Sequence, residues 1–143
     1  MDTLKELERD VMVLLAKSNV VLPKGSTLWF SHHYGIERFR EVGAAVINCI
    51  KREGYSKKYL VMLPGQRHPE HFHVHKDETF TVLYGDLVVN GEEPLERGQT
   101  MVMEPGKKHS FYTQFGCVFE EISSKEFEND SFYSNRKTLV REL

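Results

Sequence analysis

The chain has 143 residues, enough for one domain but not for two sizeable hydrophobic cores. Hydrophobic residues make up 40% and charged residues 28%, and 19 basic side chains nearly balance 21 acidic ones, giving a net charge of −2. This balance argues against a nucleic-acid-binding protein, which is usually basic, and no apolar run approaches the roughly 18 residues of a membrane span. Because the charged N-terminus lacks an apolar signal core, we expect a cytoplasmic protein with two reduced cysteines.

The first segment is predicted to form an amphipathic helix. Apolar residues recur at helical spacing at Leu4, Leu7, Val11, Leu14 and Leu15. Thr3 and Glu6 fit a capping box, in which each side chain satisfies a free backbone N–H group at the start of the helix. A loop rich in proline, glycine and serine follows over residues 20–27. We therefore expect residues 1–43 to supply a helix and a linking segment that packs on the rest of the chain.

From residue 44 onward, short β-favouring runs alternate with turn signals at a spacing near ten residues. The eight runs are AAVINCI, YLVML, HFHVH, ETFTVLY, LVV, QTMVME, HSFYTQF and CVFEEI. This rhythm is typical of an antiparallel β-sandwich or barrel. We predict an all-β barrel over residues 44–124, followed by a polar tail over 125–143 that wraps the barrel or pairs with a neighbouring subunit.

Four potential metal ligands stand at the centre of this pattern. His71 and His73 are two residues apart in a predicted strand, so their imidazoles point to the same face. Glu78 opens the next strand, where a hairpin brings facing residues within about 5 Å of each other. His109, from a strand distant in sequence, is the candidate for the fourth ligand. Three imidazoles and one carboxylate suit a divalent ion such as Mn, Fe, Co, Ni or Zn and leave positions open for a substrate.

These residues carry a resemblance to a known superfamily. The spacing of the first cupin motif is matched throughout by Gly65, His71, His73, Glu78 and Gly85. A motif match of this kind is a hypothesis until the structure confirms its context. The resemblance implies a cupin barrel, also called a double-stranded β-helix or jelly roll, with the predicted helix at its N-terminus.

The second cupin motif is matched less completely. Gly98, Gly106 and His109 fall where the motif expects them, so the histidine ligand is retained. Glu104 stands where the motif has proline, and Thr113 replaces its asparagine. These departures affect the details of the turn rather than the ligand.

A narrower resemblance connects the chain with carbohydrates. The stretch HFHVHKDE is similar to the metal-binding segment of D-lyxose isomerase-type cupins, and Lys76 falls on the lysine of their pattern. The stretch CVFEEIS also resembles a late strand of those isomerases, with Glu121 on their glutamate. Other segments, such as LPGQRHPEHFH, resemble small cupin domains attached to N-acetylneuraminate synthase-like enzymes. Both resemblances imply a sugar ligand.

The isomerase hypothesis assigns chemical roles to these residues. Interconversion of an aldose and a ketose moves a proton between adjacent carbons, while a divalent ion stabilises the developing enediolate. A carboxylate must take and return the proton. Strand alternation does not distinguish Glu120 from Glu121, and the resemblance selects Glu121 as the catalytic base. Lys76 would neutralise an oxygen near the ion.

Further candidates are assigned to substrate binding. Glu104, Tyr84 and Tyr112 could each present a polar group to a sugar, although core packing or solvation is the ordinary role of such residues. For His32 and His33, we expect a solvated loop more often than a position at the barrel mouth.

The leading hypothesis is a metal-dependent isomerase of a sugar or sugar phosphate, with manganese as the first choice of ion. The alternatives are a non-catalytic sugar-binding cupin of surface-polysaccharide or sialic-acid-type biosynthesis, and an iron-dependent dioxygenase that would use the same four ligands. Because cupin barrels expose sheet edges that pair between subunits, we also expect a homodimer, with neither nucleic acid nor membrane as a partner.

Overall fold

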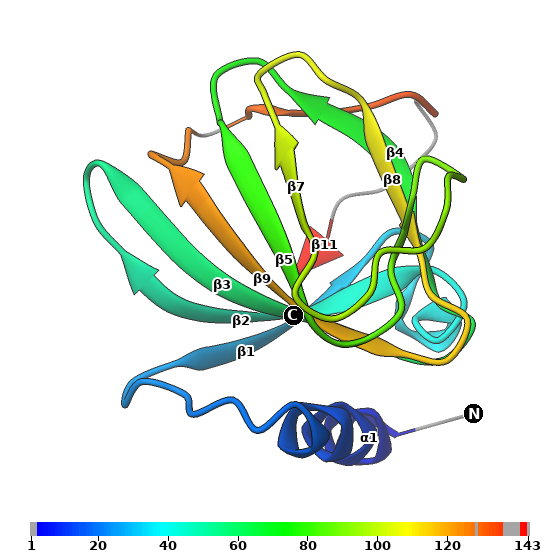
Figure 1. The fold of residues 1–143 in the computed structure, drawn as a ribbon. Coiled ribbons are helices and arrows are strands. Elements are labelled where there is room, and N and C mark those ends of the chain that lie inside the picture. The colour runs from blue at the N-terminus through cyan, green and yellow to red at the C-terminus, as the bar shows by residue number, and fades with distance from the viewer. Residues whose placement is uncertain (1–2, 128, 136–140, 143) are drawn as a thin grey trace.

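The computed structural model describes residues 3–127, 129–135 and 141–142 (Figure 1). The chain begins with helix α1 (Leu4–Lys17), whose first turn is closed by the predicted capping box between Thr3 and Glu6. Residues Ile36–Arg38 form a short 3₁₀ helix, η1. No helix within the described residues has the length and hydrophobicity that a membrane span requires.

Two antiparallel sheets form the body of the protein. In the described residues, the larger sheet has the order β11-β1-β2-β3-β9-β5-β7 and the smaller has the order β10-β4-β8-β6. The strands of the larger sheet are, in that order, β11 (Arg141–Glu142), β1 (Thr27–His32), β2 (Gly43–Lys51), β3 (Tyr55–Met62), β9 (Cys117–Ser124), β5 (Glu78–Gly85) and β7 (Thr100–Met103). The strands of the smaller sheet are β10 (Ser131–Tyr133), β4 (Arg67–His73), β8 (His109–Tyr112) and β6 (Val88–Val89).

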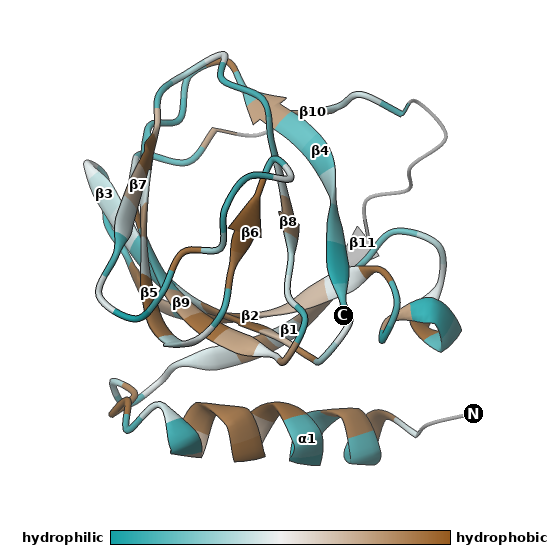
Figure 2. Cartoon of the chain, turned by 45° about the vertical axis from the view of Figure 1, so that its right-hand side comes forward, coloured by the Kyte–Doolittle hydropathy of each residue, from teal (hydrophilic) through white to brown (hydrophobic). Residues whose placement is uncertain are grey.

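The larger sheet separates two hydrophobic clusters. Its outer side is covered by α1, which Figure 2 shows running beneath β1 and β2, and the apolar stripe of the helix packs there with Phe30, Ile47 and Val118. On the inner side, Phe80, Phe111 and Phe119 pack against one another between the two sheets. This inner cluster fills one end of the barrel and leaves space near the start of β5.

The predicted fold class is confirmed. Each of the eight predicted runs overlaps one strand, β2 to β9 in order, and the two sheets enclose a barrel as the cupin resemblance implied. The sequence did not predict β1, which lies within residues 1–43 and pairs along its length with β2. Part of the tail does wrap the barrel, because β10 pairs with β4.

One motif glycine is explained by a close backbone approach at the end of β5. Gly85 has a φ of 78°, which favours glycine. A Cβ atom at this position would lie 2.0 Å from the carbonyl oxygen of Gly116. The nearby Thr113, which stands in place of the motif asparagine, donates from its hydroxyl to Asp86 and accepts from the amide of Gly116. The turn therefore keeps its hydrogen bonds despite the departure from the motif.

Candidate metal centre

Three of the predicted ligands converge inside the barrel. His71 and His73 point inward from β4, and His109 begins β8 directly opposite His71. One nitrogen from each imidazole lies within 4.8 Å of the others, and all three rings are buried. The ring centroids of His71 and His109 are 4.1 Å apart. Nitrogen atoms at this separation are close enough to share one ion.

The second nitrogen of each ring is held by a backbone carbonyl. Nδ1 of His71 lies 3.1 Å from the oxygen of Pro69, Nδ1 of His73 lies 3.2 Å from that of Asp130, and Nδ1 of His109 lies 3.2 Å from that of Lys107. Because a carbonyl only accepts, each Nδ1 donates a hydrogen bond, which leaves Nε2 as the nitrogen available to an ion. Metal-binding histidines are typically oriented in this way.

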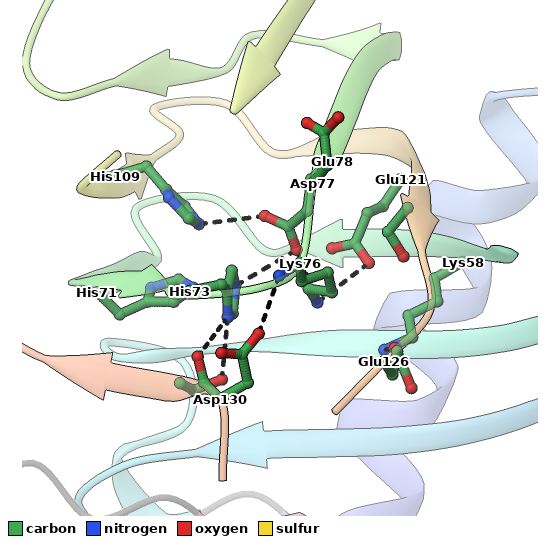
Figure 3. Close-up of polar contacts among 12 residues, drawn as sticks. Lys58, His71, His73, Lys76, Asp77, Glu78, His109, Glu121, Glu126 and Asp130 are labelled. Carbon is green, nitrogen blue, oxygen red and sulfur yellow. Dashed lines mark hydrogen bonds and ion pairs between the residues drawn. The ribbon is translucent and has the colours of Figure 1, made fainter. Parts of the chain in front are cut away.

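Glu78 adds a carboxylate to the three rings (Figure 3). Its Oε1 lies 3.4 Å from Nε2 of His73, and its Oε2 lies 3.5 Å from Nε2 of His109. Burial opposes ionisation of this group, but the contact with His73 and the charge of Lys76 outweigh burial and lower the pKa of Glu78. The carboxylate is therefore ionised at neutral pH, as a metal ligand must be.

The imidazoles of His71 and His109 are kept neutral by burial. Burial lowers the pKa of His71 to about 3, and it also lowers the pKa of His109. Oε2 of Glu78 is buried without a hydrogen-bond partner among the described residues. Three converging imidazoles, one ionised carboxylate and an unsatisfied buried oxygen fit a divalent cation. His71, His73, Glu78 and His109 are the residues that would hold it.

Lys76 and Glu121 lie beside this cluster. Nζ of Lys76 is 2.7 Å from Oε1 of Glu78 and 3.7 Å from Oε2 of Glu121. Burial would lower the pKa of Lys76, but the negative charges of Glu121 and Glu78 raise it, so the ammonium persists. Burial raises the pKa of Glu121, and Lys76 only partly opposes this effect. Its Oε2 has no hydrogen-bond partner among the described residues.

The two glutamates that the sequence left open point to opposite sides of the sheet. Glu121 faces the interior and is 6% exposed. Glu120 faces outward, where its carboxylate lies 3.3 Å from the ammonium of Lys57. The structure therefore brings Glu121, and not Glu120, to the predicted ligands.

These side chains line a cavity of about 250 Å³. Three polar side chains that line this cavity were not predicted from the sequence, namely Lys58, Glu126 and His68. Lys58 pairs across the sheet with Glu121 and forms an ion pair with Glu126. Figure 3 shows Lys58 and Glu126 beyond Glu121 as seen from the histidines. Only the pairing of β3 with β9, which are far apart in sequence, places Lys58 there.

Asp130 fixes the turn that carries Lys76. Its carboxylate accepts hydrogen bonds from the amides of Val74, His75 and Lys76 at 2.9 to 3.2 Å. Its own carbonyl is the acceptor for Nδ1 of His73. One residue thus orients a candidate ligand and the neighbouring lysine.

Three predicted substrate-binding residues do not reach the cavity. Tyr84 would face inward by strand alternation, but a β-bulge after Val82 turns it to the outer side, where it packs near α1. Tyr112 is 42% exposed on the outer face of β8, because Phe111 takes the inward position. Glu104 is exposed in the turn after β7. The structure contradicts the expectation that these side chains approach a sugar in the barrel.

The expectation of a solvated loop at His32 and His33 is also wrong. Both residues are buried. The ring of His33 meets that of His68 edge-on at 4.8 Å and lies 5.3 Å from the ring of Tyr133. His32 is the last residue of β1, and Tyr133 of β10 packs against His33.

Comparisons with known proteins agree with this geometry. The family model for the cupin domain matches residues 58–116. A curated relative, the D-lyxose/D-mannose isomerase of Thermosediminibacter oceani, is 30% identical over 126 residues, which cover 87% of this chain and 56% of the relative. The chain thus spans little more than half the length of that relative.

Solved structures share the fold at low sequence identity. The L-ribose isomerase of Acinetobacter sp. DL28 in complex with L-ribose is 13% identical, with a TM-score of 0.74 over 92% of this chain and 91% of that one. The L-ribose isomerase of Cellulomonas parahominis is also 13% identical, with a TM-score of 0.70 over 95% and 94%. At these identities the likeness establishes the fold alone.

Proposed function

We propose that this chain, a member of the cupin superfamily, is a metal-dependent sugar isomerase that interconverts an aldose and a ketose. The observation that carries the proposal is a buried carboxyl with a raised pKa, Glu121, placed beside three histidines and Glu78 in one cavity. The similarity to a D-lyxose/D-mannose isomerase supports a pentose or hexose as the substrate.

The four ligands would hold a divalent ion, with manganese as the first choice, and the ion would polarise a carbonyl and a neighbouring hydroxyl oxygen of the sugar. Glu121 then acts as the base that removes the proton from one carbon and returns it to the next, while the hydroxyl proton passes from its oxygen to the former carbonyl oxygen. Its raised pKa suits this exchange, because a carboxyl that is too acidic returns the proton poorly. The charge of Lys76 opposes the effect of burial on the pKa of Glu121, and the ammonium would donate to a sugar oxygen.

Solvent exchange tests the proposal. With Mn²⁺ or Co²⁺ and without oxygen, mannose or lyxose in D₂O should gain one deuterium at a single carbon as the ketose forms. The substitution Glu121→Gln keeps the shape but removes the base, so the rate should fall by about 10² to 10⁴. Glu120→Gln is the matched control, because that carboxylate lies outside the barrel and pairs with Lys57.

The same experiment separates the alternative functions. A sugar-binding cupin would show a sugar-dependent rise in melting temperature without deuterium exchange. A dioxygenase would consume oxygen only with ferrous iron. Full turnover by Glu121→Gln would refute the assignment of the base.

A further inference from the structure

A row of polar residues crosses the inner face of the larger sheet away from the metal centre. Glu121 pairs with Lys58, Lys58 pairs with Asn48, and Asn48 pairs with Thr27. Directly paired residues on neighbouring strands project from the same face. All four side chains therefore point toward the concave side, where an apolar core would be the ordinary filling.

A second polar row runs parallel to the first. Glu78 pairs with Ser123, Ser123 with Ser56, and Ser56 with Lys51. The hydroxyls of Ser56 and Ser123 lie 2.6 Å apart. The two rows make one hydrophilic path from β5 to β2, and the first row extends it to β1.

This path leads from the metal cavity into a second hollow of about 430 Å³. The hollow and the cavity share Val46, Lys58 and Glu126 as walls. Four inter-strand spacings separate β5 from β1, so the path follows the sheet for about 19 Å. A single sugar ring held at the metal centre leaves the far part of this path unfilled.

Trp29, the only tryptophan of the chain, lines the far hollow. It pairs with Val46 and therefore faces inward. Its Nε1 donates to the hydroxyl of Thr27 at 3.2 Å, which fixes the ring, and 38% of the residue remains exposed. A fixed, half-exposed indole beside hydroxyl and amide groups is suited to the apolar C–H face of a sugar ring, whose rim of hydroxyls needs polar partners.

The charges between the two hollows favour a neutral ligand. Glu126 forms an ion pair with Lys58, and its other oxygen lies 4.0 Å from Nζ of Lys51. Both ammonium groups already face a carboxylate, and that carboxylate would repel a phosphate. The pair instead offers donors and an acceptor to hydroxyl groups.

We infer that the far hollow is a second sugar subsite and that the chain accepts a neutral reducing disaccharide. Its reducing ring would lie at the metal centre and its second ring on Trp29. This inference rests on the proposed function for the metal end of the path. It assigns to Trp29 and Asn48 a role in specificity rather than in the chemical step.

Binding to the Glu121→Gln protein loaded with Mn²⁺ tests the inference without turnover. Mannobiose should bind about tenfold more tightly than mannose, as one aromatic stacking contact allows, and only mannobiose should shift the fluorescence of Trp29. In the Trp29→Ala variant, the dissociation constant of mannobiose, measured by calorimetry, should come within about twofold of that of mannose, and the dissociation constant of mannose should not change. Asn48→Ala keeps the fluorophore and should also weaken mannobiose selectively.

Phe115→Ala is the matched control, because this aromatic is 72% exposed and lies near α1, outside the path. Equal affinities for the two sugars, or equal weakening of both by Trp29→Ala, would overturn the subsite. Tighter binding of GDP-mannose than of mannobiose would refute the inference that the ligand is a neutral disaccharide. Selective binding of mannobiose without deuterium exchange in the wild-type protein would support the subsite and refute the isomerase. Deuterium exchange without selective binding of mannobiose would support the isomerase and refute the subsite.

Discussion

Replacing Asp130 by asparagine should weaken both the fold and the site, by an amount that follows from its hydrogen bonds. Oδ1 accepts from Val74 and His75 at 2.9 and 3.1 Å, and Oδ2 accepts from His75 and Lys76 at 3.2 and 3.0 Å. Asparagine keeps one oxygen but places an NH₂ group against the amide of Lys76. A lost hydrogen bond to a charged group is worth about 1.5 to 3 kcal/mol, so we expect a loss of about 2 kcal/mol.

Urea unfolding measures this loss as a lower midpoint with an unchanged slope. The turn over residues 74–76 would also no longer fix Lys76, so kcat for isomerisation should fall more than KM rises. The pH dependence of stability has a defined sign. Burial opposes ionisation, but the three amides lower the pKa of Asp130, so its contribution is present above the unfolded pKa and is lost as the pH falls through the lower folded value.

Asp86→Asn is the matched control. Asp86 accepts from the amides of Gln114 and Phe115 and from the hydroxyl of Thr113. It follows the far end of β5, about 26 Å from the metal centre along the strand. We expect a similar loss of stability and unchanged turnover. The reasoning is refuted if Asp130→Asn stays within about 0.5 kcal/mol of the wild type, or if both variants reduce turnover equally.

Two further predictions concern the cluster itself. Lys76→Met removes the cation that opposes the raised pKa of Glu121, so the acid limb of the pH–rate profile should move to higher pH, and turnover near neutrality should fall about a hundredfold. Mn²⁺ at 100 times its dissociation constant should stabilise the protein by about 2.7 kcal/mol. Scanning calorimetry should show this gain in His75→Ala, whose side chain is exposed, but not in His73→Ala.

The helix and the strands β2 to β9 could be predicted because their signals are local. The capping box and the turn residues act within a few positions of the elements that they bound. Strand β1 was not predicted because it lacks an alternation of buried and exposed residues. Its last three residues, Phe30, Ser31 and His32, are all buried although they point to both faces. Its register depends on its pairing with β2 and β11, which the sequence pattern does not contain.

The site follows the same division between local and distant contacts. The spacing of His71, His73 and Glu78 is set within one hairpin, so the motif places them together. Lys58 stands 63 positions before Glu121, and only the pairing of β3 with β9 brings the two side by side. Lys76 lies in a turn, where a lysine is ordinarily solvated, yet its side chain is 12% exposed because two carboxylates and the Asp130 turn hold it inward.

Contacts with His73 and Lys76 separate the behaviour of the two inner carboxyls. Its ammonium lies 2.7 Å from Glu78 but 3.7 Å from Glu121. Both glutamates are buried, yet the pKa of Glu78 is lowered, because the contact with His73 and, after it, the nearer cation overcome burial, while the pKa of Glu121 is raised. Two carboxyls whose pKa values are driven apart are suited to different tasks: the first to holding a cation, the second to exchanging a proton. If Lys76 lay equally close to both, Glu121 would become a weaker base, so the turn held by Asp130 is as much a condition of the proposed chemistry as the ligands themselves.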